Sequence, residues 1–183
     1  MAASLAGLTM AATPAVTVAD DFRCVGAKGG RTYDGNVVVP AGKWCKLNGT
    51  TVKGNVFVKR NAVVVLVGAR VDGNVQSKAK WTKKVVVRNR SNIDGDIQIN
   101  DGRRVIVKNS FIDGNIQLKG NRRLSTVNDN TVEGDIQLFS NRGGFAVWRN
   151  RVDGNLQCKN NGNPRRGDDN RVQGDKEGQC RNR

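Results

Sequence analysis

Apolar and polar residues alternate along most of this chain, in a pattern that returns about every twenty residues. Each copy holds an apolar residue, a polar residue, glycine, Asn or Asp, and then an apolar-polar-apolar run, as in residues 93–99. The copies are centred on Gly35, Gly54, Gly73, Gly95, Gly114, Gly134, Gly154 and Gly174, and the first two and the last are weaker. Successive glycines lie 19, 19, 22, 19, 20, 20 and 20 residues apart. Eight copies at nearly constant spacing indicate a repeat protein.

Within each copy the period is two, which predicts strands with one buried and one solvated face. A second short apolar run precedes the motif, at residues 63–67, 85–87, 105–107 and 145–147. Two or three strands per turn, without helical spacing, predict an all-β, single-stranded parallel β-helix of about eight turns of 19–22 residues. Crossover chirality favours a right-handed coil, and a strand spacing of roughly 4.8 Å gives a length of about 38 Å.

The corner glycines and Trp44 are expected to shape this coil. Glycine at each corner would supply backbone angles that other residues avoid. Trp44, next to Cys45, would plug the open N-terminal end, because an uncapped terminal repeat exposes its core.

Residues 1–19 differ from the rest in carrying no charge and being rich in Ala, Leu, Val and Thr. They are too short and too weakly apolar to span a bilayer, so no transmembrane segment is expected. They fit a secretory signal that ends at the small residues 17–19, although no Lys or Arg precedes the apolar run. The sequence therefore predicts a signal over 1–19, a β-helix domain over 20–183, and secretion to the cell envelope or the extracellular space.

The four cysteines form two pairs, each about one repeat apart. Cys24 and Cys45 are separated by 21 residues, and Cys158 and Cys180 by 22. Residues one turn apart in a coil lie close enough for a disulfide, so we expect one bridge at each end of the array, and four free buried thiols are the alternative. Because the pairs are far apart and the chain has no His, zinc is not expected.

The stacked Gly-Asn-Val and Gly-Asp-Ile turns resemble parallel β-helix proteins, as do the asparagines before the corners. In such folds Asn side chains often bond along the stack. The asparagines in question are Asn109, Asn130, Asn150 and Asn170. The short turns resemble those of bactofilins, β-helices that polymerise end to end, but the cysteines, the predicted signal and the basic charge depart from that family. A further resemblance, to the pectate-lyase-like superfamily, is one of fold and implies no activity by itself.

Two polar ladders are predicted on the outside of the coil. One consists of Gln76, Gln98, Gln117, Gln137 and Gln157. It can be an amide ladder that bonds along the coil, or a flat polar strip that recognises a glycan. The other consists of Asp72, Asp94, Asp113, Glu133 and Asp153. Stacked carboxylates repel one another, so Arg70, Arg151 and Arg171 are expected to pair with them locally. Calcium is the alternative.

A third feature is a basic loop edge. Its residues are Lys59, Arg60, Lys83, Lys84, Arg103, Arg104, Arg122, Arg123, Arg165 and Arg166. The coil would stack them along one side. The chain has 31 Lys and Arg against 16 Asp and Glu, so a rod with cations about 5 Å apart would attract a polyanion. The alternative is a solvated face that prevents edge aggregation.

These features predict a secreted, non-catalytic scaffold or binding module whose basic edge binds anionic cell-envelope polymers or polysaccharide. The alternatives are a small polysaccharide-active lyase or hydrolase, working through carboxylates such as Asp94, Asp113 and Asp153, and a self-assembling rod. The uniform ladder argues against catalysis, because an active site needs one unlike constellation, and no insertion builds a cleft. No nucleotide loop or nucleophile motif is present, so no cofactor is expected, and the oligomeric state is left open.

Overall fold

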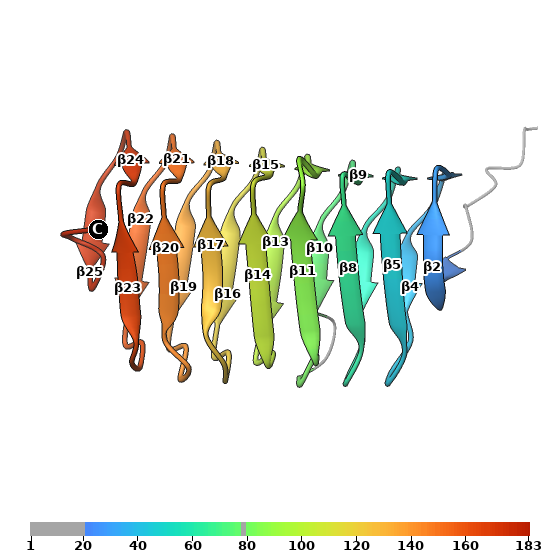
Figure 1. Cartoon of the computed structure of the whole chain (residues 1–183), viewed down its shortest axis with the longest axis horizontal. Coiled ribbons are helices and arrows are strands. Elements are labelled where there is room, and N and C mark those ends of the chain that lie inside the picture. Colours follow the sequence, from blue (N-terminus) through green and yellow to red (C-terminus); the bar gives the residue numbers. More distant parts are fainter. Residues whose placement is uncertain (1–20, 78–79) are drawn as a thin grey trace, which may run out of the picture.

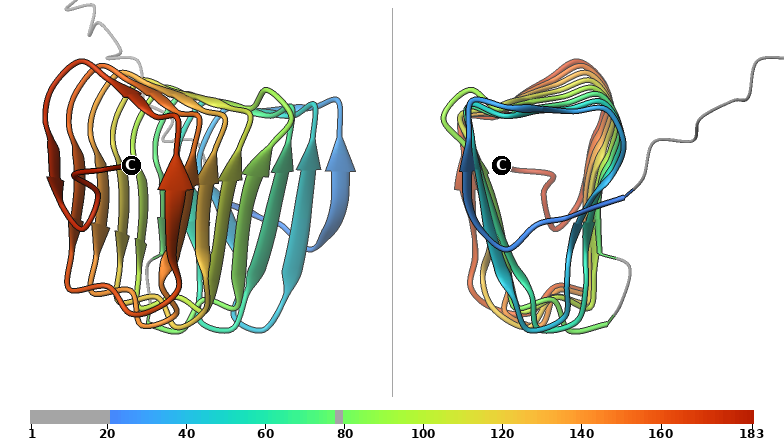
Figure 2. Two further views of the ribbon diagram at one scale, coloured as in Figure 1. Left: turned by 60° about the vertical axis from the view of Figure 1, so that its left-hand side comes forward. Right: turned by 90° about the vertical axis from the view of Figure 1, so that its right-hand side faces the viewer.

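The computed structural model describes residues 21–77 and 80–183, which form strands and turns and no helix. The strands wind into a parallel β-helix of about eight turns, with three strands in each turn (Figure 1). Seen from the N-terminal end, the chain runs clockwise as it recedes from the viewer (Figure 2, right), so the coil is right-handed. The predicted fold is confirmed. The signal predicted over residues 1–19 lies outside the described residues.

Equivalent strands of successive turns make three parallel sheets, here called A, B and C. Sheet A contains β1 (Phe22–Arg23), β4 (Val37–Val39), β7 (Val56–Val58), β10 (Val75–Ser77), β13 (Ile97–Asn100), β16 (Ile116–Lys119), β19 (Ile136–Phe139), β22 (Leu156–Lys159) and β25 (Lys176–Gly178). Sheet B contains β2 (Gly26–Gly29), β5 (Trp44–Asn48), β8 (Val63–Val67), β11 (Lys84–Arg88), β14 (Arg104–Lys108), β17 (Ser125–Asn128), β20 (Phe145–Trp148) and β23 (Arg165–Asp168). Sheet C contains the two-residue strands β3 (Thr32–Tyr33), β6 (Thr51–Val52), β9 (Arg70–Val71), β12 (Asn92–Ile93), β15 (Phe111–Ile112), β18 (Thr131–Val132), β21 (Arg151–Val152) and β24 (Arg171–Val172).

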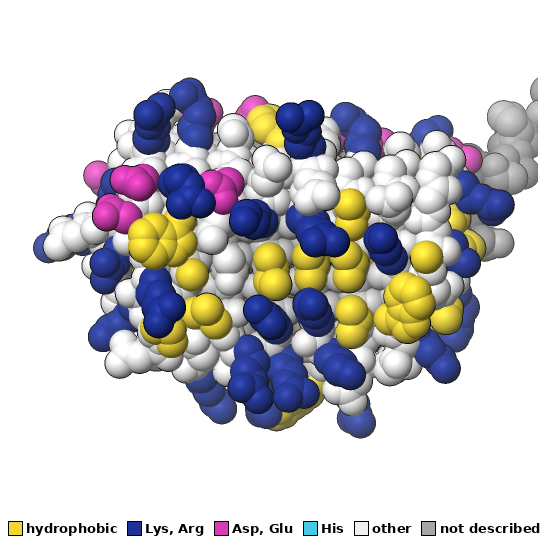
Figure 3. Space-filling model, in the orientation of Figure 1, with side chains coloured by type: hydrophobic (Ala, Val, Ile, Leu, Met, Phe, Trp, Pro, Cys, Tyr) yellow, Lys and Arg dark blue, Asp and Glu magenta, His cyan; other side chains and the backbone are white. Residues whose placement is uncertain are grey.

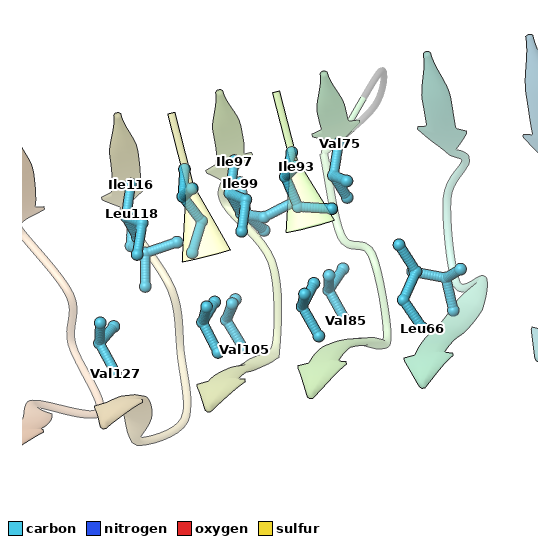
Figure 4. Packing of buried hydrophobic residues seen from close by; sticks show 14 of the residues in the cluster. Leu66, Val75, Val85, Ile93, Ile97, Ile99, Val105, Ile116, Leu118 and Val127 are labelled. Atoms are coloured by element: carbon cyan, nitrogen blue, oxygen red, sulfur yellow. The ribbon is translucent and has the colours of Figure 1, made fainter. Parts of the chain in front are cut away.

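The core is a set of apolar stacks that run along the coil axis. In sheet A, Ile97 pairs with Ile116, and Ile116 pairs with Ile136. These side chains are fully buried, as are most inward residues of sheets B and C, and Tyr33 and Val172 near the two ends are partly buried. The three sheets meet around one interior (Figure 4). Branched side chains suit such stacks because they pack well against like neighbours on a pleated surface.

The corner glycines are needed because of space, which corrects the expectation that they supply unusual backbone angles. Those from Gly54 to Gly174 do not have positive φ. A Cβ on Gly114 would instead lie 2.4 Å from Asp96 Oδ1 and 2.7 Å from the carbonyl carbon of Gly95. Successive corners stack so closely that the Gly134 N–H donates to the Gly114 carbonyl at 3.3 Å. Only glycine fits this approach.

Buried asparagines bond along the stack at the turn before sheet C. Asn150 Nδ2 donates to the Val127 carbonyl (2.8 Å) and to Asn170 Oδ1 (2.9 Å). Its Oδ1 accepts from the backbone N–H (3.1 Å) and from Nδ2 (3.0 Å) of Asn130. Asn109 does not belong to this ladder, since it has φ of 47° and its successor Ser110 bonds Asn130 Oδ1 instead. A second buried ladder, at the turn after sheet A, joins Asn121, Asn141 and Asn161.

Each end of the coil is closed by a disulfide, as the cysteine spacing predicts. Cys24 bonds Cys45, with Cα atoms 5.6 Å apart, and Cys158 bonds Cys180, with Cα atoms 5.3 Å apart. The prediction that Trp44 plugs the N-terminal end is wrong. Trp44 is 52% exposed because it occupies an outward position of β5, and alternation turns its neighbour Cys45 inward.

Candidate anion-binding site

Six of the ten residues of the predicted basic edge meet at one corner of the coil, between the end of sheet A and the start of sheet B. Each turn of the chain passes this corner through a residue with left-handed φ, such as Trp81 (76°), Asp101 (53°) and Gly120 (70°). The second and third residues after each of these three are both cationic. They are Lys83 and Lys84, Arg103 and Arg104, and Arg122 and Arg123.

The backbone fixes these pairs beside one another. Lys84 and Arg104 are direct register partners in sheet B. The Arg103 N–H donates to the Thr82 carbonyl and the Arg123 N–H to the Arg103 carbonyl, each at 2.8 Å. Because these ladders bring each turn next to the last, cations that lie about twenty residues apart in sequence become neighbours along the coil axis.

The six cations line one hollow of about 660 Å³ together with Val63, Leu124 and Gly143. Lys84 is half-buried and the other five are exposed. In Figure 3, Lys and Arg side chains spread over the sheet B face and its lower edge, while Asp and Glu gather toward β23 and β24. The hollow combines a small apolar floor with a cationic rim.

None of these six cations has a carboxylate within ion-pair distance in the described part of the chain, whereas several cations next to sheet C do. Lys53 contacts Asp34 at 2.8 Å, Arg70 contacts Asp72 at 2.9 Å, and Arg151 contacts Asp153 at 3.7 Å. Two like charges about 4 Å apart repel by about 1 kcal/mol even in bulk water. The six cations of the hollow therefore lack internal counterions, and an external anion would supply them.

Arg149 illustrates the paired arrangement near sheet C. Its Nε donates to Asp129 Oδ1 at 2.6 Å, and a second nitrogen donates to Oδ2 at 3.1 Å. The hydrogen bonds and the charge of Asp129 raise the pKa of Arg149 above its ordinary value. Such a bidentate pair leaves this cation with little free capacity for another anion.

Trp81 stands beside the hollow in an unusual conformation. Its φ of 76° is one that bulky side chains avoid, at a cost of roughly 1–2 kcal/mol. Trp81 is 42% exposed, and the guanidinium carbon of Arg122 lies 3.3 Å from the centroid of its ring. Trp81 also lines a second hollow with Asn61 and Asp101. The two hollows share Lys83, Arg103, Arg122 and Arg123.

The other four residues of the predicted edge lie elsewhere. Lys59 and Arg60 come before the corner residue Asn61, at the end of sheet A. Arg165 and Arg166 begin β23, farther along sheet B, where Arg166 pairs with Ala146. Lys59 and Arg60 are displaced because they precede the left-handed residue of their turn. Arg165 and Arg166 are displaced because they follow Asn160 by five and six residues, rather than by two and three.

The predicted glutamine ladder occupies one column on the outside of sheet A. The register pairs Gln76 with Gln98, Gln98 with Gln117, Gln117 with Gln137, and Gln137 with Gln157. The amide groups do not form one continuous chain. Gln137 donates to Gln157 at 3.1 Å, but Gln98 donates to Asp96, two residues earlier in its own turn, at 2.8 Å.

The acidic ladder is partly neutralised by arginine. Arg70 bridges Asp72 and Asp94, and Arg151 contacts Asp153. Asp153 also accepts from Gln173 Nε2 at 2.8 Å. Over residues 21–77 and 80–183, no group of three or more acidic, His or Cys side chains is placed to hold a metal ion. The structure thus shows local pairing at these two arginines, while Arg171 forms no ion pair within the same residues.

Sequence reasoning missed the position of Trp81 beside the hollow and a further ladder, which is formed by the Asn or Asp that follows each corner glycine. The residue after each corner glycine bonds to its equivalent one turn on, as when the Asn115 N–H donates to Asp96 Oδ1 at 2.7 Å and the Asp135 N–H donates to Asn115 Oδ1 at 2.8 Å. The recurring Asn or Asp after glycine was the available signal. For Trp81, the signal was a tryptophan in the longest turn.

The described residues include no helix of the length and apolar character that a membrane crossing requires. Comparison of the chain with known protein families, with curated proteins and with solved structures gives no match.

Proposed function

We propose that this protein is a secreted, non-catalytic β-helical binding module that holds anionic polymers of the cell envelope or acidic polysaccharides in the cationic hollow. The observation that carries the proposal is the cluster of six cations without internal carboxylate partners. Backbone ladders fix the positions from which these side chains extend, so a polymer can bind without rearrangement of the backbone. The two disulfides are typical of proteins that work outside the cytosol.

The arrangement suits a polymer better than a single small anion. The cation pairs recur once per turn, and adjacent strands of a sheet are roughly 4.8 Å apart. A polymer that lies along the axis can therefore place successive charges against successive pairs. Release of the counterions around such a chain makes binding steeply dependent on salt.

We expect neutralisation of three cations of the hollow to weaken polyanion binding strongly. In the variant Lys83→Gln/Arg103→Gln/Arg123→Gln, affinity for heparin at about 50 mM NaCl should fall at least about tenfold, because three charge contacts are lost. The plot of log affinity against log salt should also become shallower by roughly 2–3 units. Titration calorimetry over a range of NaCl concentrations measures both quantities.

A matched control separates this site from overall charge. The variant Arg31→Gln/Arg171→Gln/Arg181→Gln removes the same number of charges from exposed positions outside the hollow. It should change heparin affinity by less than about threefold, since long-range attraction alone is reduced. Equal losses in both triple variants, or no heparin binding by the unmodified protein at low salt, would overturn the proposal.

A further inference from the structure

We propose that Trp81 and its neighbours form a subsite for one acidic sugar ring, so that the ligand of the hollow is an acidic polysaccharide. This inference rests on the proposed function and narrows it. Its basis is the side-chain chemistry of the second hollow, which Trp81 lines and which contains a carboxylate and an amide that the hollow of six cations lacks.

Trp81 occupies a backbone position that is unusual for a tryptophan. Other turns place residues suited to left-handed φ at this corner, namely Gly42, Asn61, Asp101, Gly120, Ser140 and Asn160. Trp81 occupies the same conformation with an exposed ring. Its backbone is held by the neighbouring turns, because its N–H donates to the Asp101 carbonyl at 3.0 Å and its carbonyl accepts from the Asn61 N–H at 2.8 Å. The fold thus holds a large aromatic surface at a place where folding alone would favour glycine.

Charged and polar groups surround the Trp81 ring in the second hollow. Arg122 covers one part of the indole, and Lys83, Arg103 and Arg123 lie in the same hollow. These cations can bind a carboxylate or a sulfate. The second hollow, next to Trp81, also contains the Asn61 amide and the Asp101 carboxylate. The Asp101 carboxylate takes part in no ion pair or side-chain hydrogen bond in the described structure. Both can accept hydrogen bonds from hydroxyl groups.

One acidic sugar ring can contact all these groups at the same time. Its ring can pack its C–H face on the indole, its acidic group can meet the cations, and its hydroxyls can donate to Asp101 and Asn61. A polyphosphate has neither ring nor hydroxyls. Single-stranded nucleic acid usually relies on several aromatic residues in succession, and this hollow contains one. The observations therefore favour acidic polysaccharide.

The decisive variant is Trp81→Gly, because glycine tolerates the backbone conformation that Trp81 adopts. Its melting temperature should equal or exceed that of the unmodified protein. Its affinity for an oligogalacturonate or a chondroitin sulfate oligosaccharide should fall at least about fivefold, as expected when an aromatic stacking partner is removed. Its affinity for inorganic polyphosphate should stay within about twofold, since all the cations remain. Trp81→Phe, which keeps an aromatic ring, should recover most of the loss.

Trp148→Ala is the control for loss of an aromatic residue, because Trp148 lies on the outer face of β20, outside both hollows. It should bind every ligand as the unmodified protein does. Unchanged oligosaccharide affinity in Trp81→Gly, or an equal loss for polyphosphate, would overturn the subsite and leave the cationic hollow standing. Tighter binding of single-stranded DNA, lost in Trp81→Gly, would assign the ring to a nucleobase instead. Failure of the unmodified protein to bind any of these polyanions would remove the proposed function as well.

Discussion

Replacement of Asn150 by alanine should lower the free energy of unfolding by roughly 3–5 kcal/mol. Asn150 is 1% exposed, and its side chain makes four hydrogen bonds along the coil. Alanine would leave the backbone N–H and the Nδ2 group of Asn130 without their acceptor, and each unsatisfied buried group costs about 1–3 kcal/mol. The Val127 carbonyl and Asn170 Oδ1 would each lose a donor as well. Urea unfolding followed by circular dichroism measures the change.

Asn48→Ala is the matched control, because Asn48 is an exposed asparagine on the outer face of β5. We expect it to change the free energy of unfolding by no more than about 0.5 kcal/mol, as is usual for surface substitutions. If Asn150→Ala proved as mild as Asn48→Ala, the buried ladder would not contribute to stability as we infer.

Gly114→Ala should lower the free energy of unfolding by roughly 2–3 kcal/mol, as overpacking does in a well-packed site. The added methyl group would lie 2.4 Å from Asp96 Oδ1, and that oxygen cannot move away without losing the bonds it accepts from the backbone N–H and from Nδ2 of Asn115. It would also lie 2.7 Å from the carbonyl carbon of Gly95, which belongs to the backbone. The corner must therefore open, and the ladder of the adjacent turn is disturbed.

A second glycine provides the comparison for this result. A Cβ at Gly29 would meet only the Asn48 carbonyl oxygen, at 3.5 Å. Gly29→Ala should therefore be neutral or slightly stabilising, because alanine reduces the entropy of the unfolded chain. Thermal unfolding of both variants under the same conditions tests the difference. Similar melting temperatures for Gly114→Ala and Gly29→Ala would show that corners can accept a side chain.

The corners and the asparagine ladders have a bearing on function because they fix the spacing of the surface cations. The cations of the hollow lie just outside a corner whose interior holds Asn121 and Asn141. Asn121 Oδ1 accepts from the Gly102 N–H at 2.9 Å, directly before Arg103. A buried network of this kind favours a single arrangement of the turn, so the charged side chains above it start from a defined backbone.

The sequence alone determined the coil. Gly95, Gly114 and Gly134 recur at nearly equal intervals, and Ile97, Ile116 and Ile136 recur with them, so like residues had to stack once a strand paired with its copy one turn on. The cysteine spacing predicted both disulfides for the same reason, and the structure confirms them. A periodicity of this kind can be recognised from the order of residues along the chain, without knowledge of the tertiary structure.

The tertiary structure decided which cations meet. Lys83, Arg103 and Arg123 converge, whereas Lys59 and Arg165 belong to the same sequence pattern and lie apart from the hollow. It also set the exposed side chain of Trp81 beside Arg122. The repeat specifies the pairing of strands, but the loops of unequal length between them carry no such register. Where their side chains lie depends on how each loop packs against the turns before and after it.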